Sequence, residues 1–289
     1  MDFPSAAKRI NAYERLIRLD KPVGALLLLW PTLWAVWIAA YGHPRIDTAM
    51  IFVAGTILMR SAGCAVNDWA DRNFDGRVER TRDRPVAAGE ISPRAALAAG
   101  AVLAAVAFGL VLFLNRFAIL LSVAALAIAC AYPFAKRFFP LPQLFLGIAF
   151  GFGIPMAFAA IRDELPWECW ALLAANVFYS FAYDTEYAMV DRDDDLKVGI
   201  RTSALTLGRY DVPAVMASYA LMLAVLTAVG VLLRFDWPYD AGLATAAGMM
   251  LYHFKLIRER TREGCFRAFR HNNYVGLAIF LGIVLSYVL

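Results

Sequence analysis

Two short segments of the chain concentrate its acidic residues, because together they hold nine of the 24 aspartates and glutamates. The first is NDWADRNFD, from Asn67 to Asp75, and the second is DTEYAMVDRDDD, from Asp184 to Asp195. If each segment is helical, it places side chains with metal-binding potential one turn apart on a single face. The two predicted rows are Asn67, Asp71 and Asp75 in the first segment and Asp184, Tyr187, Asp191 and Asp195 in the second.

A row of carboxylates on one helix face predicts a bound divalent cation, because like charges one turn apart repel each other and weaken the helix. Magnesium prefers oxygen ligands and is typically held by one or two carboxylates together with substrate phosphates. Two rows can therefore hold two Mg²⁺ ions that bind a single diphosphate. Zinc or iron would favour histidine or cysteine ligands, which neither row contains. The alternative interpretation is a solvated, salt-bridged helix end, which explains one such segment more easily than two.

The two segments also share the pattern D-R-x-x-D, which begins at Asp71 in the first and at Asp191 in the second. The shared pattern predicts two four-helix pseudo-repeats, at about 22–135 and 142–254, with a ninth helix at 272–289. A site between the repeats is expected, since many membrane proteins place their binding sites at repeat interfaces.

Basic residues follow both acidic segments, and a few of them are expected to bind phosphate. Arginine suits this role because its planar fork of donors matches the oxygens of a phosphate group. Membrane topology alone explains most of the other basic residues. The candidates for contact with a diphosphate are Arg72, Lys136, Lys197 and Arg201.

The composition is typical of a membrane protein, since 61% of the residues are hydrophobic and only 18% are charged. Soluble domains carry roughly 25% charged residues. The apolar residues form blocks of about 20, the length of a helix that spans a bilayer. These blocks lie at about 22–42, 46–66, 95–114, 116–135, 142–161, 166–186, 212–233, 239–254 and 272–289. Residues 1–289 are therefore predicted to form one all-α integral membrane domain with nine transmembrane helices.

Positive charge is distributed unevenly over the predicted connections. The N-terminal tail and the loops after the second, fourth, sixth and eighth blocks hold 23 of the 28 lysines and arginines. The opposite loops hold only Arg45, Arg116, Arg162 and Arg234, and Arg60 lies inside the second block. Because positive residues mark the cytoplasmic side, we expect a cytoplasmic N-terminus and a C-terminus outside. Both acidic segments then face the cytoplasm.

Several stretches resemble those of the UbiA-type intramembrane prenyltransferases. The two acidic segments look like the two aspartate-rich motifs of that family. Flanking stretches are similar to its 4-hydroxybenzoate polyprenyltransferase branch, namely RLDKPVG (18–24), LWPTLW (29–34), YPFAKR (132–137), DDLKVGI (194–200) and NNYVG (272–276). The resemblance extends from about residue 13 to residue 276.

The resemblance implies helices arranged in a ring around a central chamber. It also implies transfer of a polyprenyl group from its diphosphate to the ring carbon ortho to the hydroxyl of 4-hydroxybenzoate, in ubiquinone biosynthesis. By motif position, the implied ligands of two Mg²⁺ ions are Asn67, Asp71, Asp75, Asp184, Asp191 and Asp195. For the carboxylate of the acceptor we expect Arg137 as a catalytic and binding residue, with Lys21 and Tyr187 as further acceptor-binding candidates.

The expected location is the bacterial inner membrane, with the active site toward the cytoplasm. The sequence indicates a lipid bilayer as surroundings, but neither nucleic acid nor a protein partner. One alternative is a prenyltransferase of the same superfamily that acts on homogentisate, a naphthoate or haem. A cation transporter is an alternative of a different class. A transporter would favour carboxylates near the bilayer midplane, whereas these carboxylates lie at predicted helix ends beside arginines.

Overall fold

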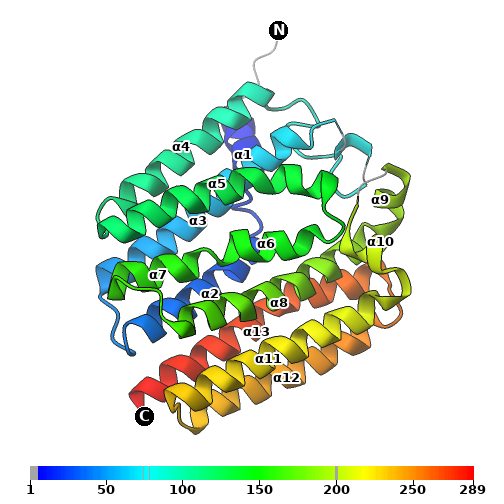
Figure 1. The fold of residues 1–289 in the computed structure, drawn as a ribbon. Coiled ribbons are helices and arrows are strands. Elements are labelled where there is room, and N and C mark those ends of the chain that lie inside the picture. Colours follow the sequence, from blue (N-terminus) through cyan, green and yellow to red (C-terminus); the bar gives the residue numbers. More distant parts are fainter. Residues whose placement is uncertain (1–5, 74, 78, 199–200) are drawn as a thin grey trace.

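In the computed structural model, every regular element within the described residues is a helix, and most helices lie side by side in one bundle (Figure 1). The structure describes residues 6–73, 75–77, 79–198 and 201–289, and for residues 77, 132–138 and 198 it describes the backbone alone. The α-helices are α1 (Ala6–Leu16), α2 (Val23–Ala39), α3 (Ile46–Ala70), α4 (Pro93–Val111), α5 (Arg116–Phe138), α6 (Pro142–Gly151), α7 (Gly153–Arg162), α8 (Trp167–Val190), α9 (Arg192–Val198), α10 (Ser203–Leu207), α11 (Asp211–Leu233), α12 (Trp237–Ile257) and α13 (Arg262–Val288). Two 3₁₀ helices, η1 (Asp75–Arg77) and η2 (Gly208–Tyr210), lie between them.

Every apolar block predicted from the sequence coincides with helical structure. By length and composition, the stretches able to cross a membrane are Ile46–Ala70, Pro93–Val111, Pro142–Arg162, Ser203–Leu233 and Arg262–Val288. Val23–Ala39 and Arg116–Ala131 are shorter apolar helices. Helices satisfy their own backbone hydrogen bonds, which is what a spanning segment requires in lipid. The prediction of an all-helical membrane protein is therefore confirmed at this level.

The N-terminal helix α1 was not among the predicted elements. Its buried side chains Ala12 and Leu16 pack in one small cluster with Val86, Ile91 and Ala96 from the connection before α4 and its first turns. The chain then turns at Arg18, which has a positive φ of 59°. These contacts tie α1 to the loop that carries the first acidic segment.

The acidic segments are not continuous helices, so the predicted single-face rows are wrong. α3 ends at Ala70 and α8 ends at Val190, which means that each helix stops at the first aspartate of D-R-x-x-D. Asp71 (φ −92°, ψ 4°) and Asp191 (φ −97°, ψ 5°) take the C-cap position with almost the same backbone conformation. Two effects favour this break, because carboxylates one turn apart repel each other and the C-terminal end of a helix disfavours negative charge.

Two predicted helix boundaries also need correction. The block 142–161 consists of α6 and α7, with a turn at Phe152 between Gly151 and Gly153. These glycines allow close packing on both sides, because a Cβ on Gly151 would lie 2.5 Å from Asn176 Nδ2 and one on Gly153 would lie 2.6 Å from Thr32 Oγ1. The last helix begins ten residues before the predicted 272, because the polar first turns of α13 pack on the acidic end rather than in an apolar block.

The centre of the bundle is formed by α2, α8 and α13. α13 packs against α12, α2 and α8, whereas α8 also packs against α11 and α6. The largest buried side chains include Trp34, Tyr179 and Tyr183. Trp34 Nε1 donates to the Gly276 carbonyl at 3.1 Å, which ties α2 to α13. This packing fixes the helix ends that carry the acidic segments.

Candidate active site

The two acidic segments lie at the same end of the bundle. In Figure 1, α9 and α10 lie at the end where α8 finishes, close to the connection that follows α3. Three of the candidate metal ligands are almost fully buried there, since Asp75, Asp191 and Asp195 are only 6–7% exposed. Buried carboxylates require partners or a bound cation, so their contacts define the site.

Arginines from two different loops hold the first acidic segment. Arg84 Nη1 lies 2.9 Å from Asp75 Oδ2 and 3.4 Å from Asp68 Oδ1. Arg18, from the turn between α1 and α2, donates to the same Asp68 oxygen at 2.8 Å. The Asp75 carbonyl also accepts a hydrogen bond from Thr81 Oγ1 at 2.9 Å. Asp68 therefore shares two arginines and stabilises the loop around Asp75.

The second acidic segment is held by an arginine of the loop that follows the first. Arg80 Nε lies 2.9 Å from both carboxylate oxygens of Asp191, and Arg80 Nη2 lies 2.5 Å from Oδ2. The guanidinium carbon is also 4.5 Å from the ring centroid of Tyr187. A second link runs through Arg262 of α13, which pairs with Glu79 at 2.8 Å and with Asp194 at 3.0 Å. These contacts bring the two segments to one place.

Burial and charge act in opposite directions on these groups. Burial raises the pKa of the Asp75 carboxyl, Arg84 lowers it in part, and the nearby charge of Asp71 raises it further. Burial disfavours the charged form of Arg80, but Tyr187 and Asp191 outweigh this effect, so the pKa of the guanidinium is raised. Arg80 therefore stays charged, and Asp75 has an unusually strong need for a cation.

The other candidate residues occupy several different places. Asn67 is half-buried in the last turn of α3 and accepts the Asp71 amide through its carbonyl at 2.9 Å. Arg72 turns back on α3, donates to the Trp69 carbonyl at 2.7 Å and lies over its ring. The remaining half-buried candidate ligands are Asp71 and Asp184, and the exposed candidates are Lys21, Lys197 and Arg201. The side chains of Lys136 and Arg137, like that of Tyr132, lie outside the described part of the structure.

The donor chemistry of the site fits Mg²⁺. Within the described residues, no three histidine, cysteine, aspartate or glutamate side chains lie close enough to hold a metal ion together. Instead, Arg84 and Arg80 neutralise Asp75 and Asp191. All six candidate ligands offer oxygen atoms, which is the set that Mg²⁺ prefers. A cation would compete with these arginines for the same carboxylate oxygens.

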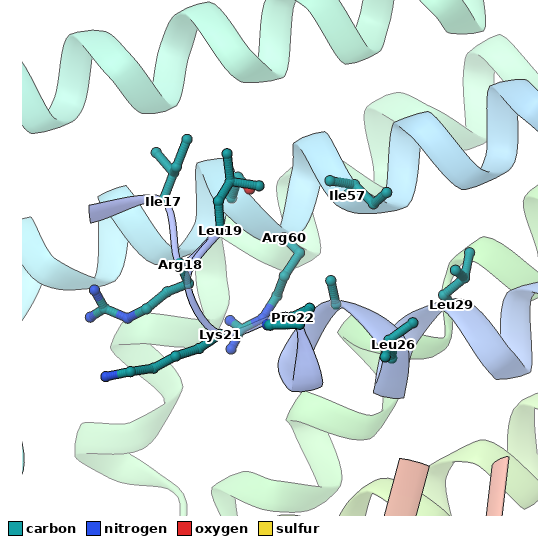
Figure 2. Close-up of a pocket in the computed structure, with 11 residues that line it drawn as sticks. Ile17, Arg18, Leu19, Lys21, Pro22, Leu26, Leu29, Ile57 and Arg60 are labelled. Carbon is teal, nitrogen blue, oxygen red and sulfur yellow. The ribbon is translucent and has the colours of Figure 1, made fainter. Parts of the chain in front are cut away.

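Arg60 is a candidate site residue that the sequence analysis did not select. Its side chain reaches from α3 toward Pro22 at the start of α2, beside a cavity of about 160 Å³ (Figure 2). Arg60 Nε is buried and has no hydrogen-bond partner within the described structure. Tyr183, Asp184 and Tyr187 of α8 lie within its electrostatic range. The available signal was an arginine inside an apolar block, because a charged residue in a spanning helix usually faces a functional cavity.

A second polar cluster that was missed lies behind α8. Glu186 is fully buried and accepts hydrogen bonds from Tyr219 at 2.9 Å and from Asn272 Nδ2 at 2.8 Å. His253 Nδ1 lies 3.1 Å from the Tyr219 hydroxyl, and its other ring nitrogen lies 2.9 Å from His271. This network connects α8, α11, α12 and α13, and so fixes the helix that carries Asp184 and Asp191.

A larger cavity, of about 790 Å³, opens at the opposite end of the bundle. Tyr41, Asp47, Asn115 and Arg162 contribute to its lining. Arg162 is already engaged there, because it pairs with Glu168 at 2.5 Å and donates to the Ala39 carbonyl at 2.9 Å. The acidic segments contribute nothing to this lining, so the candidate active site is placed at the other end of the bundle, where both acidic segments and their arginines lie.

Comparison with known proteins places this geometry in a family. The model of the UbiA prenyltransferase family matches residues 28–277. The chain therefore belongs to the UbiA prenyltransferase family. Its relatives include the 4-hydroxybenzoate octaprenyltransferase of Cupriavidus necator, 60% identical over 282 residues that cover 98% of this chain and 99% of the relative. The enzyme of the same name from Azoarcus sp. is 59% identical and covers 97% of this chain and 98% of the relative.

Solved structures show the same fold. The apo structure of a UbiA homologue from Aeropyrum pernix K1 matches 90% of this chain and 97% of its own, with a TM-score of 0.79 and 28% identity. A UbiA homologue from Archaeoglobus fulgidus bound to GPP and Mg²⁺ matches 95% of this chain and 99% of its own, with a TM-score of 0.71 and 17% identity. The chain is an all-helical membrane protein with this fold.

Proposed function

We propose that this chain transfers an octaprenyl group from octaprenyl diphosphate to 4-hydroxybenzoate, at the carbon ortho to the hydroxyl, with release of diphosphate. The observation that carries the proposal is the ion pair between Arg80 and Asp191, because it joins the loop that follows the first acidic segment to the second segment at one end of the bundle. One diphosphate can then meet carboxylates and arginines from both segments. Two relatives with this printed name are 60% and 59% identical over nearly their whole length, which supports the same substrates.

The proposed membrane arrangement has nine spans around a central chamber, in the inner membrane of a bacterium. The spans are α2, α3, α4, α5, α6 with α7, α8, α11, α12 and α13. The N-terminus and the acidic end face the cytoplasm, and the C-terminus lies outside. The excess of lysine and arginine at the acidic end supports this orientation.

Two Mg²⁺ ions are proposed to bind between the acidic segments. Their ligands are Asn67, Asp71 and Asp75 on one side and Asp184, Asp191 and Asp195 on the other. When bound, the metal stabilises the negative charge that develops on the leaving diphosphate. Arg80 and Arg84 carry charge to the same place and are suited to bind diphosphate oxygens through two donors at once.

The acceptor carboxylate is proposed to bind Arg60. A buried guanidinium with an unused N–H requires an anionic or polar partner, and the adjoining cavity is lined by apolar groups such as Leu26, Leu29 and Ile57 that suit an aromatic ring. Lys21 lies at the rim of the same cavity. Arg137, the sequence-based choice for this role, stays a prediction.

Substitution of Arg60 tests this assignment. We expect Arg60→Gln to raise the KM for 4-hydroxybenzoate about tenfold to a hundredfold, because a charge-assisted hydrogen bond is worth about 1.5–3 kcal/mol. The KM for octaprenyl diphosphate should change less than twofold. Steady-state kinetics in detergent with each substrate varied in turn measure both constants. Equal increases in the two constants would exclude a specific role toward the acceptor.

The overall proposal is tested by a product assay. Membranes that contain the chain are incubated with Mg²⁺, octaprenyl diphosphate and, separately, 4-hydroxybenzoate, homogentisate and a dihydroxynaphthoate. The expected product is octaprenylated 4-hydroxybenzoate, identified by mass, and it should be lost on chelation of Mg²⁺. Asp191→Asn should be inactive, whereas Asp193→Asn, at an exposed position of the same segment, serves as the matched control. Product from another acceptor alone, or full turnover with a chelator, would contradict the proposal.

A further inference from the structure

Arg80 packs on a stack of aromatic rings contributed by α8 and α13. Its guanidinium carbon lies 4.5 Å from the ring centroid of Tyr187 on α8. Tyr187 in turn stacks on Phe269 of α13, with ring centroids 4.4 Å apart and an interplanar angle of 29°. Phe266 extends the stack, with its ring centroid 6.2 Å from that of Phe269. The cation is therefore backed by a continuous aromatic surface.

Stacking on the ring of Tyr187 leaves the edge of the Arg80 guanidinium, where its N–H groups lie, available for anions. A guanidinium that stacks on a ring uses its face, while its N–H groups point outward in the plane. In Arg80, Nε and Nη2 donate to Asp191. The side chain keeps 28% of its surface exposed. The ring of Tyr187 thus sets the orientation in which Arg80 presents its donors.

A buried polar contact between α8 and α13 fixes the aromatic stack, because it prevents the two helices that carry the rings from sliding along each other. Glu186 precedes Tyr187 on α8, and Asn272 follows Phe269 by one turn on α13. Asn272 Nδ2 donates to Glu186 at 2.8 Å within the fully buried network described above. Sliding one helix along the other would break this hydrogen bond between buried groups, which is costly.

We propose that Tyr187 is a positioning residue for Arg80: its ring, supported by Phe269, orients the guanidinium toward the diphosphate of the prenyl substrate. This inference rests on the proposed function, and it assigns Tyr187 to the diphosphate rather than to the aromatic acceptor. The ring face makes the contacts with Arg80 and Phe269, so the hydroxyl group is dispensable. When the diphosphate or a cation draws Asp191 away from Arg80, the aromatic stack still holds the guanidinium in place.

The test compares Tyr187→Leu, Tyr187→Phe and Phe269→Leu in the full chain in detergent. Cation–π contacts contribute about 0.5–2 kcal/mol, so we expect Tyr187→Leu to raise the KM for octaprenyl diphosphate about twofold to thirtyfold. The dissociation constant of a non-reactive prenyl thiolodiphosphate, measured by calorimetry, should rise by the same factor. Phe269→Leu should have a smaller effect in the same direction, and Tyr187→Phe should restore both constants to within about twofold of the original. The KM for 4-hydroxybenzoate should stay unchanged in all three variants.

A matched control and a second background separate positioning from general damage. Tyr210→Leu removes an exposed ring under Arg209, at 4.8 Å, outside the site, and should alter neither constant. In an Arg80→Gln background, Tyr187→Leu should add nothing, since its effect acts through Arg80. A rise confined to the KM for 4-hydroxybenzoate, or an undiminished effect without Arg80, would overturn the inference. If the unaltered chain makes no prenylated product, the proposed function fails instead.

Discussion

The two acidic segments have similar backbone conformations at their D-R-x-x-D turns, but their carboxylates pair with arginines from different places. In each, the D-R-x-x-D pattern begins with an aspartate at a helix C-cap, and the amide four residues later donates to that aspartate's carbonyl, at 2.9 Å in the first segment and 2.8 Å in the second. In the first segment, Asp75 is neutralised by Arg84, nine residues further along the same loop. In the second, Asp191 is neutralised by Arg80, which lies in the loop that follows the first segment. The second segment therefore depends on the loop that follows the first.

The arginines that follow the first aspartate show the same contrast. Arg72 folds back on its own helix and contacts Trp69. Arg192 reaches outward and pairs at 2.8 Å with Asp211, a fully buried carboxylate that also binds Arg260 at 2.7 Å. The matched backbones are thus embedded in different surroundings. A shared local pattern specifies a similar turn, but its ion pairs depend on which helices lie nearby.

The largest expected effect comes from removing one carboxylate in each segment. Asp75→Asn and Asp191→Asn should each reduce kcat by roughly a thousandfold, because each removes charge that stabilises the leaving group. The double variant should be little worse than either single variant, since the two segments act as one unit. Product formation at saturating Mg²⁺ and insertion into the membrane fraction are the measurements. Multiplied losses in the double variant would show that the segments act separately.

The stability of the fold should depend strongly on Asp211, the buried carboxylate that pairs with Arg192 of the second segment. Asp211→Asn should lower the free energy of unfolding by about 3 kcal/mol, because it leaves Arg192 and Arg260 beside a site that has lost its buried charge. Thermal unfolding in detergent measures the loss as a lower melting temperature. Asp240→Asn, an exposed position in the first turn of α12, is the control. An unchanged melting temperature for Asp211→Asn would remove the contrast drawn between the two segments.

Asp68, the buried carboxylate of the first segment, should contribute less to stability. Asp68 is 1% exposed and contacts Arg18 and Arg84, but Arg84 keeps Asp75 as a partner when Asp68 is changed. Asp68→Asn should therefore destabilise the fold by about 1–2 kcal/mol. Asp83→Asn, whose side chain is 88% exposed, should have almost no effect. A larger loss for Asp68→Asn than for Asp211→Asn would reverse the proposed order.

The helices and the gathering of acidic residues at one end could be predicted, whereas the partners of those residues could not. Apolar blocks reveal helices because a membrane span must bury its backbone within itself. Four arginines follow the first segment between residues 77 and 84, and nothing in their spacing indicates that Arg80 meets an aspartate 111 residues away. That contact arises from the packing of α13 and α8, which places Tyr187 and Phe269 beneath the guanidinium.

Helix ends were the other limit of the sequence analysis. The row of Asn67, Asp71 and Asp75 assumed that α3 continues, but periodicity alone does not show where electrostatic repulsion ends a helix. Arg60 had a usable signal, as a charge within an apolar block, but the acidic residue that acts on it electrostatically, Asp184, is on α8 and more than 100 residues away in the sequence. Tertiary contacts between distant helices therefore decide which of the candidate cations serve the site.

The smallest expected effect concerns Arg72, which the sequence analysis placed at the diphosphate. Its contacts with the Trp69 carbonyl and ring keep it on its own helix, and partly exposed contacts of this kind contribute about 0.5–1 kcal/mol. Arg72→Gln should therefore lower the melting temperature slightly and leave the KM for octaprenyl diphosphate within about twofold, while Arg80→Gln raises that KM at least about tenfold. Both variants remove one positive charge near the same diphosphate, so their difference isolates placement from net charge. If Arg72→Gln raised the KM as much as Arg80→Gln, the first segment would contribute its own arginine to the substrate, and the dependence of the second segment on the loop that follows the first would no longer distinguish them.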